Sequence, residues 1–231
     1  MFIIILIKSI EKKYTENFLN GHIHFTNYKK FREIEKEKIG DPKEVKITNN
    51  LNGKHTVKIE PHNSDISIEF IADGIIEAKE PIFKSTIKID CYSIVDEEYI
   101  EKEFKDNNLI NINVNTNFFE ELERLEPDRD ILICYNAEEF IDRINKNLKK
   151  KFLSRKVKYF PVNENPYAKH IRNIENLSYE KQHNIAIDSI FQKEETFKNQ
   201  KEYRLAVIDL DDDFISIGDI RDLFINITNE V

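Results

Sequence analysis

The sequence predicts an α+β protein with a mixed, largely antiparallel sheet and flanking helices. Over 45–89, short segments rich in Ile, Val and Phe are separated by turn residues, a pattern typical of antiparallel strands. Later segments such as 137–150 carry apolar residues at helical spacing, which indicates amphipathic helices that cover a sheet. The chain has 231 residues, so we expect a single domain over 1–231 with a sizeable core.

Composition narrows the class of protein. Hydrophobic residues make up 40% of the chain and charged residues 34%, which is typical of a globular protein and not of a disordered one. The net charge of -8 argues against a general nucleic-acid coat, although it leaves room for a local basic site. Cys91 and Cys134 lie in separate apolar runs with no C-x-x-C motif. We therefore expect buried, reduced thiols in a cytoplasmic protein.

The chain begins with an apolar run over 1–7. The run is too short to span a bilayer and has neither a basic start nor a small-residue cleavage site. We expect a buried first strand and no membrane partner. A helix over 11–19 follows and ends at Asn20-Gly21.

A strand over 22–26 places His22 and His24 on one face. Two histidines two residues apart would begin a metal site, but no third ligand follows at a diagnostic spacing. We therefore expect no metal here, and we interpret the pair as a hydrogen-bonded wall of a pocket. Tyr28 opens a segment over 27–38 whose apolar residues recur at helical spacing.

The remaining elements follow from periodicity and turn residues. Asn52-Gly53 and Asp73-Gly74 are typical of hairpin turns. Strands are expected at 45–48, 55–60, 66–71, 74–77, 84–94, 130–135, 157–160, 200–208 and 214–218. Helices are expected at 97–107, 115–125, 137–150, 179–192 and 219–224, with a long loop at 161–177.

Between Arg143 and Lys158 the chain has eight basic residues and no acidic one. Such a run is usually a solvated helix end, where positive charge is favourable. The alternative is a surface that faces phosphate or nucleic acid. The residues of this candidate patch are Arg143, Lys149, Lys150, Lys151, Arg155 and Lys156.

The most informative stretch is the predicted strand 200–208. Strand periodicity would place Gln200, Glu202 and Arg204 on one face. Polar groups on a buried face need partners, which a ligand can supply. The alternative is a strand whose Glu202 and Arg204 pair with neighbours across the sheet. Ser93 lies at the end of an earlier predicted strand.

Several short motifs occur in one order: G-H-I-H-F-T, G-D-P-K-E, I-D-C-Y-S, K-V-K-Y and F-Q-K-E-E-T-F-K-N-Q-K-E-Y-R-L. The series resembles a broad bacterial and phage family of domains, mostly of unknown function. Members carry an N-D-P-x-E-like turn, a C-[FY]-S strand and a late E-x-E-[WY]-R element. Gly40 stands where that family has Asn, and Gln200 where it has Glu.

More distantly, the arrangement is similar to the ADP-ribosyltransferase superfamily. This resemblance implies that Glu202 holds the ribose of NAD and stabilises the oxocarbenium-like charge as the glycosidic bond breaks. It also implies that Gln200 orients the acceptor and that Ser93 steadies Glu202 or the ribose. The implied NAD-binding residues are His22, His24, Tyr28 and Arg204.

The function implied by these resemblances is an NAD-dependent ADP-ribosyltransferase-like toxin or phage-defence effector. Its acceptor would be a protein or a nucleic acid, and an antitoxin or other partner protein would fit the same setting. The alternative is a non-enzymatic nucleotide-sensing or protein-binding module of phage–host conflict. An enzyme should bring Gln200, Glu202 and Ser93 together in a cleft open to water, whereas a binding module should bury Glu202 against Arg204.

A third and weaker hypothesis is a nuclease or metal-dependent hydrolase that uses the aspartates after the strand. Asp209, Asp211 and Asp213 lie close together in sequence. Successive aspartates in a loop usually face solvent, so we expect a loop there.

Overall fold

A seven-stranded sheet is the frame of the protein. The computed structural model describes residues 5–28, 47–59, 68–78, 86–95, 100–105, 108–114, 129–161 and 177–228. Six strands follow the order β10-β13-β6-β1-β9-β15, and β3 pairs with β6. All pairings in this sheet are antiparallel. The strands are β1 (Leu6–Glu11), β3 (Thr26–Asn27), β6 (Ile87–Ile94), β9 (Arg129–Cys134), β10 (Phe152–Lys156), β13 (Glu202–Ile208) and β15 (Phe224–Asn226).

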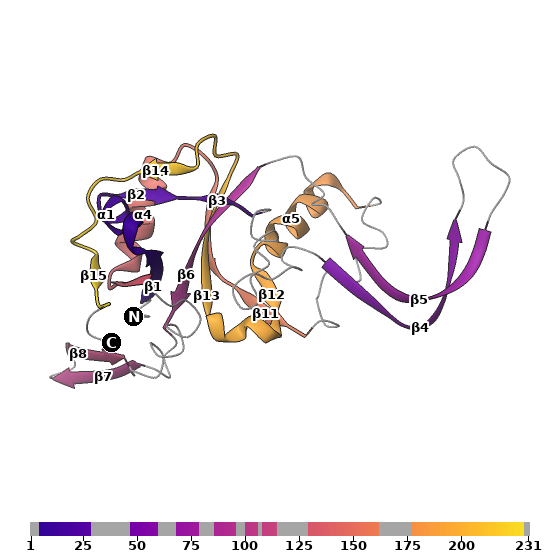
Figure 1. Ribbon diagram of the computed structural model, residues 1–231, viewed down its shortest axis with the longest axis horizontal. Helices are drawn as coiled ribbons and strands as arrows, with labels where there is room; N and C mark the ends of the chain where they lie inside the picture. Colours follow the sequence, from indigo (N-terminus) through magenta and orange to yellow (C-terminus); the bar gives the residue numbers. More distant parts are fainter. Residues whose placement is uncertain are drawn as a thin grey trace.

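Helices cover both faces of the sheet. Helices α1 (Lys12–Leu19) and α4 (Ala137–Asn147) lie to one side of β6 and β13, and α5 (Tyr179–Ser189) lies to the other (Figure 1). The side chains of Asn136 and Ser178 cap the N-termini of α4 and α5, because each accepts a hydrogen bond from a backbone N–H in the first turn. The α+β class and the mostly antiparallel sheet predicted from the sequence are confirmed.

Strand β13 is the centre of the core because both of its faces are buried. Tyr203, Leu205 and Val207 belong to the cluster that packs against α1 and α4. Ala206 and Ile208 belong to the cluster that packs against α5. Neighbouring residues of a strand point to opposite faces, so this one strand joins the two halves of the core.

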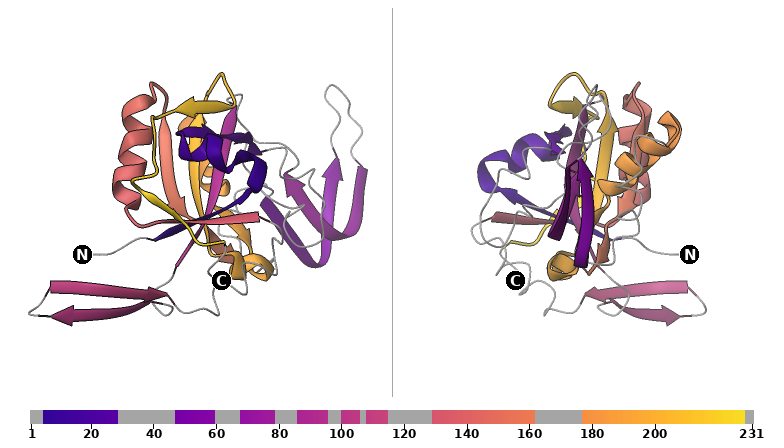
Figure 2. Two further views of the ribbon diagram at one scale, coloured as in Figure 1. Left: turned by 60° about the vertical axis from the view of Figure 1, so that its left-hand side comes forward. Right: turned by 90° about the vertical axis from the view of Figure 1, so that its right-hand side faces the viewer.

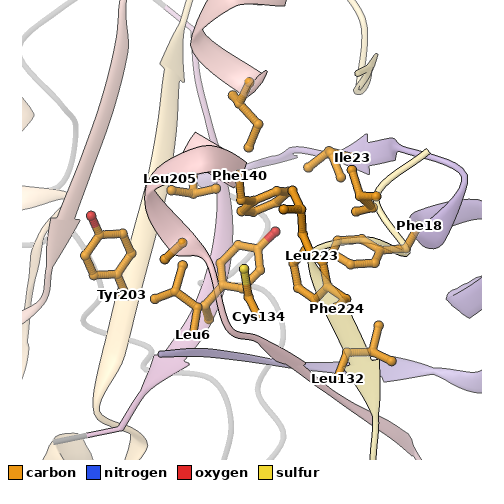
Figure 3. Packing of buried hydrophobic residues seen from close by; sticks show 14 of the residues in the cluster. Leu6, Phe18, Ile23, Leu132, Cys134, Phe140, Tyr203, Leu205, Leu223 and Phe224 are labelled. Atoms are coloured by element: carbon orange, nitrogen blue, oxygen red, sulfur yellow. The ribbon is translucent and has the colours of Figure 1, made fainter. Parts of the chain in front are cut away.

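Aromatic side chains fill the core under α1 and α4. The ring of Phe140 lies edge-on to that of Phe224 at 5.0 Å, and Phe224 is edge-on to Phe18 at 5.1 Å between centroids. Tyr92 of β6 approaches Phe140 at 5.8 Å. Figure 3 shows the rings of Phe18, Phe140 and Phe224 grouped together, with Leu205 of the sheet next to Phe140. Edge-to-face geometry is favourable for aromatic pairs beyond the area they bury.

Short two-stranded sheets complete the described part of the chain. Strand β2 (His22–His24) pairs with β14 (Phe214–Ser216), and β11 (Lys158–Phe160) pairs in parallel with β12 (Gln192–Glu194). Two hairpins lie outside the seven-stranded sheet (Figure 2). They are β4 (Ile47–Ile59) with β5 (Ile68–Ala78), and β7 (Ile100–Lys105) with β8 (Asn108–Val114).

The predicted hairpin turns at Asn52-Gly53 and Asp73-Gly74 are wrong. Both dipeptides lie inside the β4–β5 ladder, where Gly74 pairs with Leu51. The register shifts between Leu51 and His55, so the flexible Asn-Gly pair is absorbed by an irregularity within a long strand. A turn dipeptide therefore marked a bulge and not a chain reversal.

Two predicted helices are also wrong. The segment predicted as a helix at 97–107 contains strand β7, which pairs with β8 and gains backbone partners that outweigh local helix preference. The segment 219–224 is a turn, in which the Asp219 carboxylate accepts from the Arg221 N–H at 2.9 Å, and it leads into β15. The predictions for 29–38 and 115–125, and nearly all of the loop at 161–177, lie outside the described residues.

Strand β10 was missed by sequence analysis, and the segment 22–26 forms two strands, β2 and β3, in different sheets. The described helices are all too short or too polar to span a bilayer. Neither cysteine forms a disulfide: Cys134 is buried and Cys91 is half-buried. Burial raises the pKa of the Cys134 thiol to about 12, so it stays a thiol at neutral pH.

The end of α1 meets the segment before β15 at two glycines. Gly21 has φ +84° and Gly218 has φ +80°, a backbone region that favours glycine. The Ile217 N–H donates to the Gly21 carbonyl at 3.0 Å. A Cβ on Gly21 would lie 1.8 Å from the carbonyl oxygen of Gly218, whereas a Cβ on Gly218 would have no heavy atom within 4 Å.

These two glycines form a matched pair for a stability test. We expect Gly218→Ala to cost about 1–2 kcal/mol, because only the left-handed backbone is strained. Gly21→Ala carries the same strain plus a collision with backbone, and we expect it to cost roughly 3 kcal/mol or more. Urea unfolding of both variants measures the difference. Equal losses would show that the two segments do not approach as described.

Candidate functional site

The site is built on β13, where Glu202 and Arg204 share the face that α5 covers. Arg204 is 0% exposed and Glu202 is 7% exposed. The guanidinium binds the carboxylate side-on through one edge: Nε donates to Oε1 at 2.6 Å and Nη2 donates to Oε2 at 3.0 Å. A two-pronged pair of this kind fixes the geometry of both side chains. The prediction that Glu202 and Arg204 share a face is confirmed.

A second cation reaches the same carboxylate from β12. Lys193 Nζ lies 2.9 Å from Glu202 Oε2 and donates to Gln200 Oε1 at 2.7 Å. The prediction that Gln200 shares the strand face is wrong, because Gln200 ends the 3-10 helix η3 (Glu195–Gln200) and Lys201 follows with φ 44°. The left-handed residue turns the chain into β13, and Lys193 then links Gln200 to Glu202. We call Lys193, Gln200, Glu202 and Arg204 the ion cluster.

Backbone contacts hold the ion cluster in place. Arg204 Nη1 donates to the carbonyl of Ile190, the residue that caps the C-terminus of α5. The Glu202 N–H donates to the Tyr159 hydroxyl at 2.8 Å, and the Glu202 carbonyl accepts from the Val157 N–H at 2.8 Å. The cluster therefore connects α5, β11 and β13.

The electrostatics keep Glu202 ionised. Burial by itself would raise the pKa of Glu202, because it disfavours the charged form. The charges of Arg204 and then Lys193 outweigh burial, and hydrogen bonds from Arg204 and the Cys91 thiol act in the same direction. The pKa of Glu202 therefore lies well below its usual range. Burial raises the pKa of the neighbouring Tyr159 well above its ordinary value.

Ser93 joins the cluster through the strand register. It pairs with Glu202, and Cys91 pairs with Arg204, across the β6–β13 ladder. Residues opposite each other in antiparallel strands project from the same face. The structure thus brings together the three residues predicted as catalytic, although Glu202 is buried while Ser93 and Gln200 are half-buried.

Chemically, this arrangement is a compensated ion cluster. Both oxygens of Glu202 accept from cations within the protein. A carboxylate with a strongly lowered pKa carries no proton near neutral pH, so it does not act there as a general acid. The nitrogens of Arg204 bond to Glu202 and to Ile190, and its buried position keeps it from a solvent-borne phosphate.

The other residues predicted to bind NAD lie on β2 and in the apolar core under α5. His22 and His24 are exposed on β2, in a separate two-stranded sheet. The ring of His22 lies edge-on to Phe214, and His24 Nδ1 lies 3.3 Å from Thr26 Oγ1. Tyr28 is 2% exposed within the cluster under α5.

Several members of the candidate basic patch already have acidic partners. Arg143 bonds to Glu139 and Asp222 on α4 and the turn before β15. Lys150 lies 3.3 Å from Asp211, and Arg155 lies 2.8 Å from Asp188. The exposed members Lys149, Lys151 and Lys156 flank or belong to β10.

The aspartate loop after β13 binds a lysine of the protein. Lys88 Nζ donates to the carbonyls of residues 211 and 212 at 3.0 and 2.8 Å, and lies 3.0 Å from Asp213 Oδ1. Asp209 Oδ1 accepts from the Thr86 N–H at 3.0 Å. Within the described ranges, no three His, Cys, Asp or Glu side chains gather as they would around a metal ion. The loop therefore serves as a counter-ion for Lys88.

Sequence analysis missed three contributors to the ion cluster. Lys193, Tyr159 and the carbonyl of Ile190 all approach Glu202 or Arg204 from other elements. The only signal in the sequence was the position of Lys193 just before Glu194 and Glu195, where η3 begins. Strand alternation cannot reveal a contact that depends on a helical turn and a left-handed residue.

Comparison of the chain with family models, with curated proteins and with solved structures finds no match.

The ion cluster makes a sharp prediction for Glu202→Gln. The substitution keeps the size of the side chain but removes the negative charge that faces the buried Arg204 and Lys193. We expect the free energy of unfolding to fall by about 3–5 kcal/mol, the usual cost of breaking a buried pair from one side. The matched control is Glu195→Gln in η3, whose pair with Lys198 at 3.7 Å is exposed and should change stability by less than about 0.5 kcal/mol. Equal effects in urea unfolding would contradict the cluster.

The Glu202 carboxylate should make the free energy of unfolding depend on pH in the acidic range. Its pKa is lower in the folded protein than the ordinary 4.5, so its contribution is complete above that value and is lost as pH falls towards the folded pKa. The difference in unfolding free energy between wild type and Glu202→Gln should therefore be constant from pH 7 to 5 and shrink below pH 4. A difference that does not change with acid would show that Glu202 is not held as an anion.

Proposed function

We propose that this chain is a non-enzymatic binding module. The observation that carries the proposal is the ion cluster, in which Arg204 and Lys193 take both oxygens of Glu202 beneath α5. A carboxylate that stabilises a reacting cation needs an oxygen directed at the substrate in a preorganised site. Here both oxygens of Glu202 bind cations of the protein itself.

The rest of the molecule is consistent with a rigid frame that presents surface to a partner. Strand β13 is buried on both faces, and helices cover the sheet on each side. Binding residues in such proteins lie on the edges and loops of the frame. The setting of phage–host conflict is supported by the motif resemblance alone.

A second candidate function is the ADP-ribosyltransferase-like toxin or phage-defence effector, with an ADP-ribosyltransferase-like fold. One observation favours it: Ser93 and Gln200 both lie beside Glu202, the first through strand register and the second through Lys193. In that case NAD is the substrate, and a movement of Lys193 would have to release one oxygen of Glu202.

Incubation of the purified protein with labelled NAD and a cell extract separates the two candidates. For a binding module we expect no release of nicotinamide and no transfer of label by the wild type. Glu202→Gln is a poor probe here because it should strongly destabilise the fold, so the variant of choice is Ser93→Ala. NAD consumption by the wild type that Ser93→Ala abolishes, with an unchanged melting temperature, would refute the binding module and support the transferase.

A further inference from the structure

Strand β10 ends the seven-stranded sheet, and among the described residues no strand pairs with its outer edge. Its inner edge bonds to β13 at both ends of the ladder. The Ile208 N–H donates to the Lys151 carbonyl at 3.0 Å, and the Val157 N–H donates to the Glu202 carbonyl at 2.8 Å. Hydrogen-bonded and non-hydrogen-bonded pairs alternate along an antiparallel ladder. The bonds at the two ends therefore determine which residues of β10 point their backbone N–H and C=O groups towards β13.

This alternation leaves the backbone groups of Phe152 and Ser154 pointing away from β13. Leu153, which lies between them, pairs with Ala206 and uses its backbone within the sheet. Phe152 and Ser154 are half-buried, and no described strand pairs with their outward N–H and C=O groups. Such groups are a template for another strand.

Along the sequence, the charges of β10 and its flanks are all positive. Between 149 and 158 there are six basic residues and no acidic one. Lys149, Lys151 and Lys156 are exposed. A second copy of this chain would bring like charges together across the edge, which disfavours a symmetric dimer there. An acidic strand would instead place carboxylates beside these lysines.

We propose that the outer edge of β10 accepts an extended, acidic segment of a partner protein as an additional strand. The proposal rests on the binding-module function above and names the partner class. Main-chain bonds to Phe152 and Ser154 supply affinity, and the flanking lysines select for acidic side chains. Because the lysines are exposed, the attraction is screened by salt.

The same residues fit a nucleic acid less well. Arg143, Lys150 and Arg155 already pair with Asp222, Asp211 and Asp188, which places carboxylates within the basic surface. The net charge of the chain is -8. A phosphate backbone also makes no use of an open strand edge, whereas a peptide does.

The experiment compares two fluorescent peptides of alternating Thr and Glu that have the same charge. One is unmodified, and the other is N-methylated at every residue so that it cannot donate main-chain hydrogen bonds. We expect the unmodified peptide to bind to the full chain, and the methylated peptide to bind at least about tenfold more weakly. An oligothymidylate of matched charge should not compete.

A backbone variant localises the effect to β10. Ser154→Pro removes an N–H that points away from β13, a position that edge strands tolerate. Ser154→Ala keeps that N–H and is the matched control. We expect Ser154→Pro to bind the unmodified peptide about tenfold more weakly while Ser154→Ala binds as wild type does, and melting curves identify a variant that fails to fold.

Several outcomes would overturn the proposal. They are the absence of peptide binding, equal binding of both peptides, equal competition by the oligothymidylate, and a wild-type dimer that Ser154→Pro dissociates. Any of these would mean that the lysines prevent strand pairing at this edge or bind another partner. NAD consumption is measured separately on the same protein, so failure of the binding-module function is distinguishable from failure at β10.

Discussion

The fold depends on how Glu202 is compensated beneath α5. A carboxylate there would be unfavourable by itself, because burial removes it from water. Arg204 and Lys193 supply two cations from β13 and β12, and Arg204 also reaches the carbonyl of Ile190 at the end of α5. The cluster adds little net stability compared with apolar side chains of the same size, because desolvation of the charges offsets their attraction. Its main effect is on geometry. It demands one position of α5 and η3 against the sheet.

Polar requirements of this kind recur where the sheet is imperfect. Strand β6 pairs with β1 only at its last residues and with β3 near its start. Between these contacts, Lys8 of β1 bonds to Asp90 and to the carbonyl of Cys91. The hydroxyl of Tyr92 donates to the same Asp90 at 2.6 Å. A lysine side chain thus takes the place of a missing strand pairing, much as Lys88 is held by the loop after β13.

The sequence predicted well what depends on local periodicity. The α+β class, α1, α4, β9 and the apolar part of β13 all followed from apolar spacing. Sequence reasoning failed where a distant partner decides the conformation, as in β7, which lies in a segment that was expected to be helical. For the candidate site it placed Glu202 and Arg204 on one face but misassigned Gln200, because a single left-handed residue, Lys201, separates η3 from β13. No periodic pattern records such a residue.

The strand order also bears on how the chain is made. Strand β6 lies between β1 and β13 in the sheet, yet β6 ends at Ile94 and β13 begins at Glu202. At ribosomal rates of about 5–20 residues per second, roughly 5–20 seconds separate the emergence of these two neighbours. For that interval one edge of β6 has no partner, and its alternating apolar residues are open to other chains. A protein with this topology is therefore expected to benefit from a chaperone during synthesis more than its modest size suggests.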